Sequence, residues 1–146
     1  MAVAAASVVL PRGAEGWTRA QAEALLRIVE DMFHRRDLEA LVHGFTPDCV
    51  FRFAEQPEQR GRDAIRAFFA ARFARQKGYR LRKTLLALEG NVLANLWEGT
   101  WEDARTSVAM TGHGLEVWRM RDGMIAEWDA AFNVWPAAGE RTSAIM

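Results

Sequence analysis

The first pattern along the chain is helical. After Thr18, apolar residues recur at spacings of three and four with charged residues between them. Thr18 followed by Gln21 has the form of a capping box, which marks a helix start. The spacing predicts a helix over about 18–36, and Asp37 then begins a second, short helix over 38–45.

The pattern next changes to one short strand and one more helix. Residues 50–53 predict a strand, and the polar residues 54–60, which include a proline, predict a loop. Gly61 opens a third helix that carries phenylalanines on one side and ends near Gly78. The first half of the chain therefore predicts three helices around one strand.

The second half predicts long strands joined by turns. They are expected over residues 79–88, 92–101, 106–121 and 124–135. The sequence 121–123, Arg-Asp-Gly, has the composition of a hairpin turn, and Pro136 ends the last strand. Helices followed by consecutive antiparallel strands predict an α+β fold with the helices packed on one face of the sheet. A parallel α/β fold is disfavoured because no helix separates the last four strands.

Length and composition fit one globular domain, because the chain has 146 residues, of which 50% are hydrophobic and 26% charged. We expect a flexible lead-in over residues 1–16, the domain over 17–136 and a tail over 137–146. The apolar start has no basic residue before it, and Cys49 is the only cysteine. Both observations favour a cytoplasmic protein.

The charge balance, the hydropathy and the His and Cys positions argue against several classes of partner. The 19 basic and 19 acidic residues balance, and the basic residues form no stripe, so we expect no nucleic-acid partner. No apolar stretch approaches the roughly 20 residues that cross a membrane, so we expect no membrane partner. Three separated histidines and one cysteine do not make a metal site, and no motif indicates a cofactor.

Alternation along the strands indicates which side chains share a face. A face that contains Glu116 also contains Trp118, and the neighbouring strands add further tryptophans to the same side. The expected pocket is apolar and aromatic, and it suits a flat or bulky apolar small molecule. Its predicted lining consists of Val29, Phe33, Phe53, Trp97, Trp101, Trp118, Trp128 and Phe132.

Glu116 is the candidate catalytic residue. A carboxyl group among tryptophan rings loses hydration, which favours a neutral acid that donates a proton or holds an oxyanion. The alternative is that Glu116 pairs with an arginine, such as Arg82 or Arg119, and is structural.

The remaining polar candidates have weaker support. They are Asn95, His113, Asp129 and Asn133. Strand alternation places the last three on the face opposite Glu116, where solvent or a second subunit is the expected neighbour. A buried Lys83 would suit a Schiff-base nucleophile, but its position between Arg82 and Thr84 favours exposure.

Several local motifs resemble the nuclear transport factor 2-like superfamily. The stretch 36–50 is similar to its helix–helix–strand entry, and 61–65 with Phe68 is similar to the start of its third helix. The chain further resembles a SnoaL-like group over about residues 17–135. That match rests on Tyr79-Arg80-Leu81, Lys83, Ala87, Gly90-Asn91, Trp101, Gly114, Glu116, Trp118, Gly123 and Ala130 to Asn133. The resemblance implies a cone-shaped fold and a homodimer through the sheet face.

The resemblance also implies a range of activities, which includes isomerases, hydrolases, cyclases and dehydratases. The catalytic positions of ketosteroid isomerases match Val29, Phe53 and Glu116, of which only Glu116 is acidic. The acid of the epoxide hydrolases matches Ala130 in the run Trp128-Asp129-Ala130. Three functions therefore stay open: an acid–base enzyme that uses Glu116, a protein that only binds a hydrophobic ligand, and a protein-interaction domain.

Overall fold

Three helices cover one face of a six-stranded sheet. In the computed structural model, which describes residues 16–139, the helices are α1 (Arg19–His34), α2 (Leu38–His43) and α3 (Gly61–Arg75). The strands are β1 (Phe45–Phe53), β2 (Gln59–Arg60), β3 (Gln76–Glu89), β4 (Val92–Asp103), β5 (Ala109–Arg121) and β6 (Met124–Pro136). The predicted α+β class is confirmed. Residues 1–15 of the expected lead-in and 140–146 of the expected tail lie outside the described residues.

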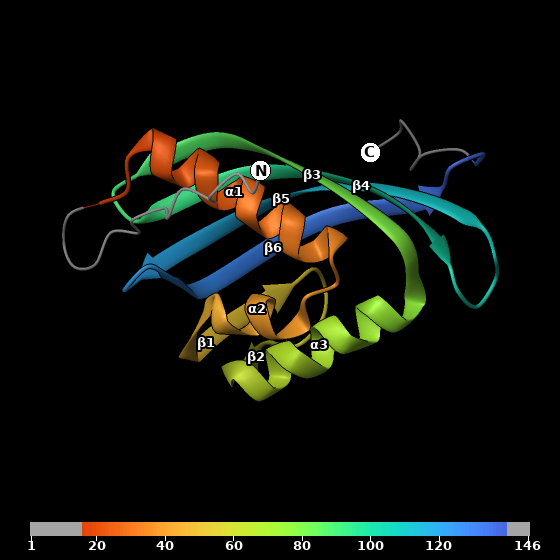
Figure 1. Ribbon diagram of the computed structural model, residues 1–146, viewed down its shortest axis with the longest axis horizontal. Helices are drawn as coiled ribbons and strands as arrows, with labels where there is room; N and C mark the ends of the chain where they lie inside the picture. The colour runs from red at the N-terminus through yellow and green to blue at the C-terminus, as the bar shows by residue number, and fades with distance from the viewer. Residues whose placement is uncertain (1–15, 140–146) are drawn as a thin grey trace, which may run out of the picture.

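The strands lie in the order β2-β1-β6-β5-β4-β3. Every neighbouring pair is antiparallel except β1 and β6, which are parallel. Figure 1 shows the four long strands as one curved surface, with α1 running across it and α2 and α3 beside β1. The curved, mostly antiparallel sheet agrees with the prediction.

Two segments differ from the predicted elements. Strand β1 begins at Phe45, inside the predicted second helix, because this segment pairs with β6 at Ile125. A register shift follows Phe45, which accommodates Pro47 and its missing N–H group. The predicted loop contains β2, whose Gln59 pairs with Phe51.

Helix α1 is fixed against β3, the edge strand of the sheet. The predicted capping box is present at its start: the Thr18 hydroxyl accepts from the Gln21 N–H, and the Gln21 side chain accepts from the Thr18 N–H. Further along, Glu30 accepts from the Lys83 N–H at 2.6 Å, and His34 accepts from the Leu81 N–H at 3.0 Å. These bonds use edge N–H groups that would otherwise be open. They also set the height of α1 above the sheet.

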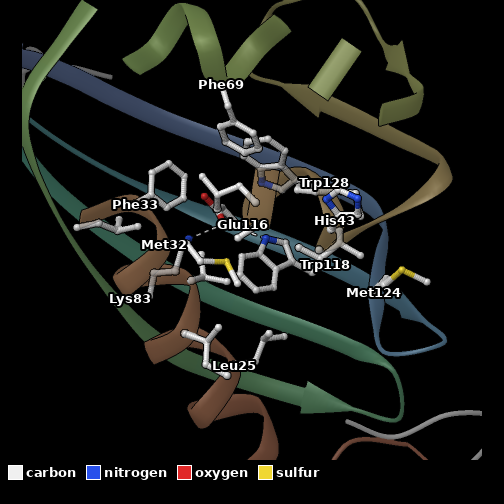
Figure 2. Close-up of a pocket in the computed structure, with 18 of the residues that line it drawn as sticks. Leu25, Met32, Phe33, His43, Phe69, Lys83, Glu116, Trp118, Met124 and Trp128 are labelled. Atoms are coloured by element: carbon white, nitrogen blue, oxygen red, sulfur yellow. Dashed lines mark hydrogen bonds and ion pairs between the residues drawn. The ribbon is translucent and has the colours of Figure 1, made fainter. Parts of the chain in front are cut away.

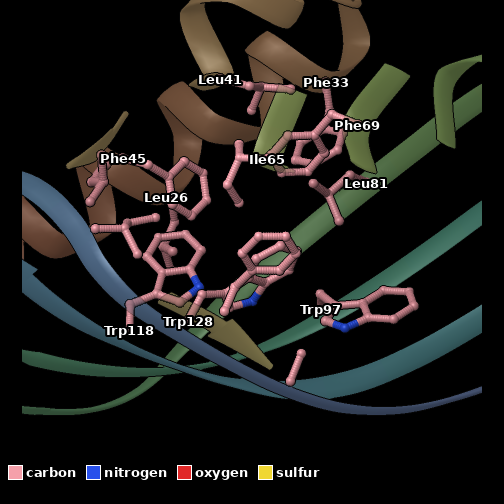
Figure 3. Close-up of a cluster of buried hydrophobic side chains, with 14 of the residues drawn as sticks. Leu26, Phe33, Leu41, Phe45, Ile65, Phe69, Leu81, Trp97, Trp118 and Trp128 are labelled. Carbon is pink, nitrogen blue, oxygen red and sulfur yellow. The ribbon is translucent and has the colours of Figure 1, made fainter. Parts of the chain in front are cut away.

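The core between the helices and the sheet is rich in aromatic rings (Figure 3). Trp128 on β6 stacks on Phe69 of α3 and on Phe51 of β1, with ring planes 18° and 21° apart. A Cβ atom at Gly114 would lie 2.6 Å from the Trp97 indole nitrogen and 2.5 Å from the Ala131 oxygen. Gly114 therefore leaves the room that the Trp97 indole occupies.

Candidate functional site

A cavity of about 350 Å³ lies between α1 and the concave face of the sheet (Figure 2). Helix α1 supplies one wall with Leu25, Val29 and Phe33, and the sheet supplies the opposite wall with Trp118 and Trp128. The lining also includes Ile28, Met32, Ala40, Leu41, His43, Gly44, Phe45, Phe69, Arg72, Tyr79, Leu81, Lys83, Trp97, Glu116, Met120, Gly123, Met124 and Ile125. This size and this apolar lining suit a small organic molecule.

A buried ion pair lies in the wall of this cavity. The Lys83 Nζ donates to the Glu116 Oε2 at 2.7 Å and to the Asn95 Oδ1 at 3.1 Å. The Trp118 indole N–H donates to the same Glu116 oxygen at 2.8 Å. The side chains of Lys83 and Glu116 are only 3% and 7% exposed, so water hardly hydrates either charge. Figure 2 shows the two side chains pointing toward each other.

The expectation that Lys83 is exposed is wrong. On β3 the buried positions alternate as Tyr79, Leu81, Lys83 and Leu85, so Lys83 shares their inward face. The alternative partners for Glu116 are also wrong: Arg82 lies on the exposed side of β3, and Arg119 donates to Asp129 at 3.2 Å. The lysine side chain crosses β4 to reach the carboxyl on β5.

Burial disfavours the charged form of Lys83, and two neighbouring groups partly oppose this effect. Burial lowers the pKa of the Lys83 ammonium group, because the charged form loses its hydration. The carboxylate of Glu116 opposes this shift. The Lys83 nitrogen also lies 5.0 Å from the centre of the Trp118 ring, whose face attracts a cation. The site therefore holds an amine from which a proton is removed more easily than from an exposed lysine.

Three buried N–H donors have no partner among the described residues. They are the indole N–H groups of Trp97 and Trp128, which both line the cavity, and the amide nitrogen of Asn95. A buried donor without a partner is unfavourable, and a ligand oxygen would satisfy it. Trp128 is thus a candidate for holding a polar atom of a bound molecule.

The predicted single pocket is divided in two. Phe53, Trp101 and Phe132 do not line the first cavity; they line a second one of about 530 Å³. Arg72 and Trp97 line both cavities. The Arg72 guanidinium group lies within 5.4–5.8 Å of the ring centres of Phe33, Tyr79, Phe53 and Phe68. Strand alternation could not predict this boundary between the two cavities, because it depends on Arg72, which lies on α3.

The remaining predicted polar residues are not in the first cavity. Asn95 is fully buried behind Lys83, to which it is hydrogen bonded. His113, Asp129 and Asn133 lie on the outer face of the sheet. There Asp129 is bonded to Arg52 at 3.1 Å, and the His113 ring packs against Trp135.

Other cavity residues were absent from the sequence-based set. Arg72, Tyr79 and His43 line the cavity, and only Tyr79 could have been found from strand alternation. Burial raises the pKa of the Tyr79 hydroxyl group, and this hydroxyl accepts from Arg72 at 3.3 Å. Within residues 16–139, no group of three or more His, Cys, Asp or Glu side chains is arranged to hold a metal ion. Over the same range, no helix is long and apolar enough to cross a membrane.

A family model described as the SnoaL-like domain matches residues 25–128. Among curated proteins, none matches this chain. An NTF2-like protein of unknown function from Burkholderia pseudomallei aligns with a TM-score of 0.67 at 19% identity, covering 76% of this chain and 89% of that one. An LEH-like epoxide hydrolase of M. tuberculosis aligns with a TM-score of 0.61 at 14% identity, covering 74% and 81%.

A further structural match is TerC, co-crystallised with polyporic acid. It aligns with a TM-score of 0.66 at 23% identity, covering 77% of this chain and 90% of that one. At these identities the structural likenesses show a common fold and no common reaction.

Proposed function

The chain belongs to the family of SnoaL-like domains, and we propose on this basis that it is a small-molecule enzyme with Glu116 as its proton-transferring group. The ligand is mostly apolar and binds in the first cavity. The reaction is of the isomerase, hydrolase, cyclase or dehydratase type, in which a proton is given to the ligand or taken from it.

The single observation that carries the proposal is the buried Lys83–Glu116 pair in an otherwise apolar cavity wall. Glu116 is the only carboxyl group that the described residues contribute to this cavity. Its Oε2 accepts from Lys83 and Trp118, while no donor among the described residues reaches its Oε1. One oxygen thus orients the group, and the other stays available for a proton. An acid or base held in this way is typical of proton-transfer sites.

The structural neighbours support the small-molecule part of the proposal. One is an LEH-like epoxide hydrolase, and another was crystallised with polyporic acid. The cavity volume lies at the lower end of the roughly 300–1,000 Å³ of ordinary ligand sites.

The test is a ligand screen followed by an activity assay. The melting temperature of the purified protein is measured in the presence of steroid enones, epoxides, terpenoids, aromatic polyketides and fatty acids. A ligand at about 100 times its dissociation constant stabilises the fold by roughly 2.7 kcal/mol. Each bound compound is then assayed for conversion by the wild type and by Glu116→Gln. We expect turnover to disappear in the variant while binding persists; full turnover by Glu116→Gln would overturn the proposal.

A second candidate is a binding protein that does not convert its ligand. It is favoured by the absence of a second carboxyl group from the cavity lining that the structure describes. In this case Trp128→Ala weakens binding, and no product of the bound compound is detected with either protein. Any product from the wild type rejects this candidate.

We also propose that the outer face of the sheet forms a homodimer contact. Leu96, Leu115 and Ala131 lie in one row across β4, β5 and β6, on the side opposite the cavity. Leu115 is 55% exposed, which leaves an apolar side chain in the middle of the face.

A further inference from the structure

The two lysines of the chain lie in opposite environments. Lys77 and Lys83 are both on β3. The side chain of Lys77 is 62% exposed and lies 3.8 Å from Glu102. The side chain of Lys83 is 3% exposed and ends in the wall of the first cavity. A buried lysine in a ligand-sized cavity is costly for stability, which favours a chemical role for this side chain over a structural one.

The position of Lys83 is set from both sides of the strand. Its backbone N–H donates to Glu30, and its backbone oxygen accepts from Arg27, so α1 holds the strand at this point. Its side chain donates to Glu116 and to Asn95. A neutral amine has two hydrogens, which these two acceptors use. The nitrogen lone pair then occupies the remaining tetrahedral position and is not consumed by a hydrogen bond.

We propose that Lys83 is a nucleophile that forms an imine with the carbonyl carbon of an aldehyde or ketone bound in the first cavity. The proposal rests on the proposed function and narrows its substrate class to carbonyl compounds with an apolar body. Burial supports it, since a lysine that loses its proton more easily is the better nucleophile.

The steps balance without any added oxidant or reductant. The Lys83 ammonium first gives a proton to the Glu116 carboxylate. The lone pair of the neutral amine bonds to the carbonyl carbon, and a proton moves from the nitrogen to the carbonyl oxygen, which gives a carbinolamine. The protonated Glu116 then gives its proton to the hydroxyl group, which leaves as water as the C=N bond forms. The protonated imine then draws electrons from the neighbouring carbon, so the Glu116 carboxylate removes a proton there. In a substrate with a carbon–carbon double bond next to that carbon, return of the proton to the far end of the conjugated system, followed by hydrolysis, releases a rearranged carbonyl compound and the free amine.

This role accounts for the single acid in the described cavity lining. Proton removal next to a carbonyl needs a base and a group that accepts the electrons. Glu116 is the base, and the imine of Lys83 accepts the electrons, so no second acid is required. Both groups act from their observed positions, 2.7 Å apart.

The test is chemical trapping on the full-length protein with benzaldehyde and sodium cyanoborohydride. The hydride reduces the imine to a stable secondary amine, and peptide mass spectrometry identifies the modified residue. A lower pKa raises the neutral fraction of an amine at neutral pH, and only the neutral amine attacks the carbonyl group. We therefore expect Lys83 to be modified faster than Lys77.

Variants separate imine chemistry from general damage to the cavity. Lys83→Arg keeps the positive charge and the donors but forms no imine, so the peptide that contains position 83 carries no adduct. The matched control Lys77→Arg leaves modification of Lys83 unchanged. Glu116→Gln retains the amine but removes the proton donor, so Lys83 is trapped more slowly. Circular dichroism spectra of the variants are compared with that of the wild type, so that only folded proteins are scored.

Two outcomes overturn the inference. One is modification of Lys83 no faster than that of Lys77, and the other is an equal total amount of adduct on Lys83→Arg and on the wild type. If a screened compound is converted in a Glu116-dependent way while Lys83 is not trapped, the imine is rejected and the proposed function stands. If Lys83 is trapped but Glu116→Gln converts the screened compounds as well as the wild type, the proposed function fails instead.

Discussion

Removal of Lys83 alone is expected to destabilise the fold strongly, because it leaves the Glu116 carboxylate buried without a partner. At the 2.7 Å separation of the pair and an effective dielectric constant of about 20, the gross attraction is roughly 6 kcal/mol. Lost hydration offsets part of this attraction. Breaking a buried pair from one side typically costs about 3–5 kcal/mol, which is a large part of a stability of roughly 5–15 kcal/mol.

The perturbation is Lys83→Met, which keeps the length of the side chain and removes its charge. Stability is measured by urea unfolding of the wild type, the single variants Lys83→Met and Glu116→Gln, and the double variant. The free energy of unfolding of Lys83→Met should fall by about 3–5 kcal/mol. The double variant should recover most of the loss, because no uncompensated charge stays buried. The matched control Lys77→Met removes an exposed pair and should change stability by less than about 0.5 kcal/mol.

The reasoning is refuted if Lys83→Met loses less than about 1 kcal/mol, or if the losses of the two single variants simply add in the double variant. Either result would mean that the two groups are not coupled in a dry environment. The same four proteins serve the activity assay, so stability and turnover are compared on one set of samples.

Three further predictions concern other parts of the molecule. Gly114→Ala should cost about 1–3 kcal/mol in urea unfolding, because the new Cβ would lie 2.5 Å from a backbone oxygen of β6; a neutral result would contradict this close packing. Asp103 has a pKa held low by the Arg105 N–H and the Arg75 guanidinium, so its contribution is present above about pH 4 and lost as the pH falls further. Asp103→Asn should therefore flatten the acid side of the stability profile, and a parallel profile would reject this account. Leu115→Arg should convert a dimer into monomers in sedimentation velocity without lowering the melting temperature of the monomer, whereas an unchanged dimer would place the contact elsewhere.

Much of the concave face could be predicted from strand alternation alone. Trp97, Glu116, Trp118 and Trp128 all lie on the inner face of their strands. The period of two belongs to the strand itself and does not depend on its neighbours. The contacts of Lys83 with Asn95 and Glu116 could not be predicted in this way. They depend on the order of β3, β4 and β5 in the sheet, which no periodicity in the sequence reveals.

Lys83 shows where composition and alternation disagree. Its neighbours Arg82 and Thr84 are polar, which favoured exposure. In a strand, however, sequence neighbours face opposite sides, so two polar neighbours favour an inward position for the residue between them. Leu81 and Leu85, two residues away on either side, gave the same indication. The division of the pocket by Arg72 had no such indication, because it requires the angle at which α3 packs on the sheet.

The position of the Lys83–Glu116 pair argues that it serves chemistry more than stability. An apolar pair of similar volume is often as stable as a buried ion pair, or more so, so the pair gives the fold no clear advantage. It also lies in the wall of a ligand-sized cavity, which is lined by Trp97 and Trp128, whose indole N–H groups have no partner among the described residues. A double variant that folds as well as the wild type but neither traps an aldehyde nor converts a ligand would separate the two roles. A double variant that retains turnover would assign the pair to the fold.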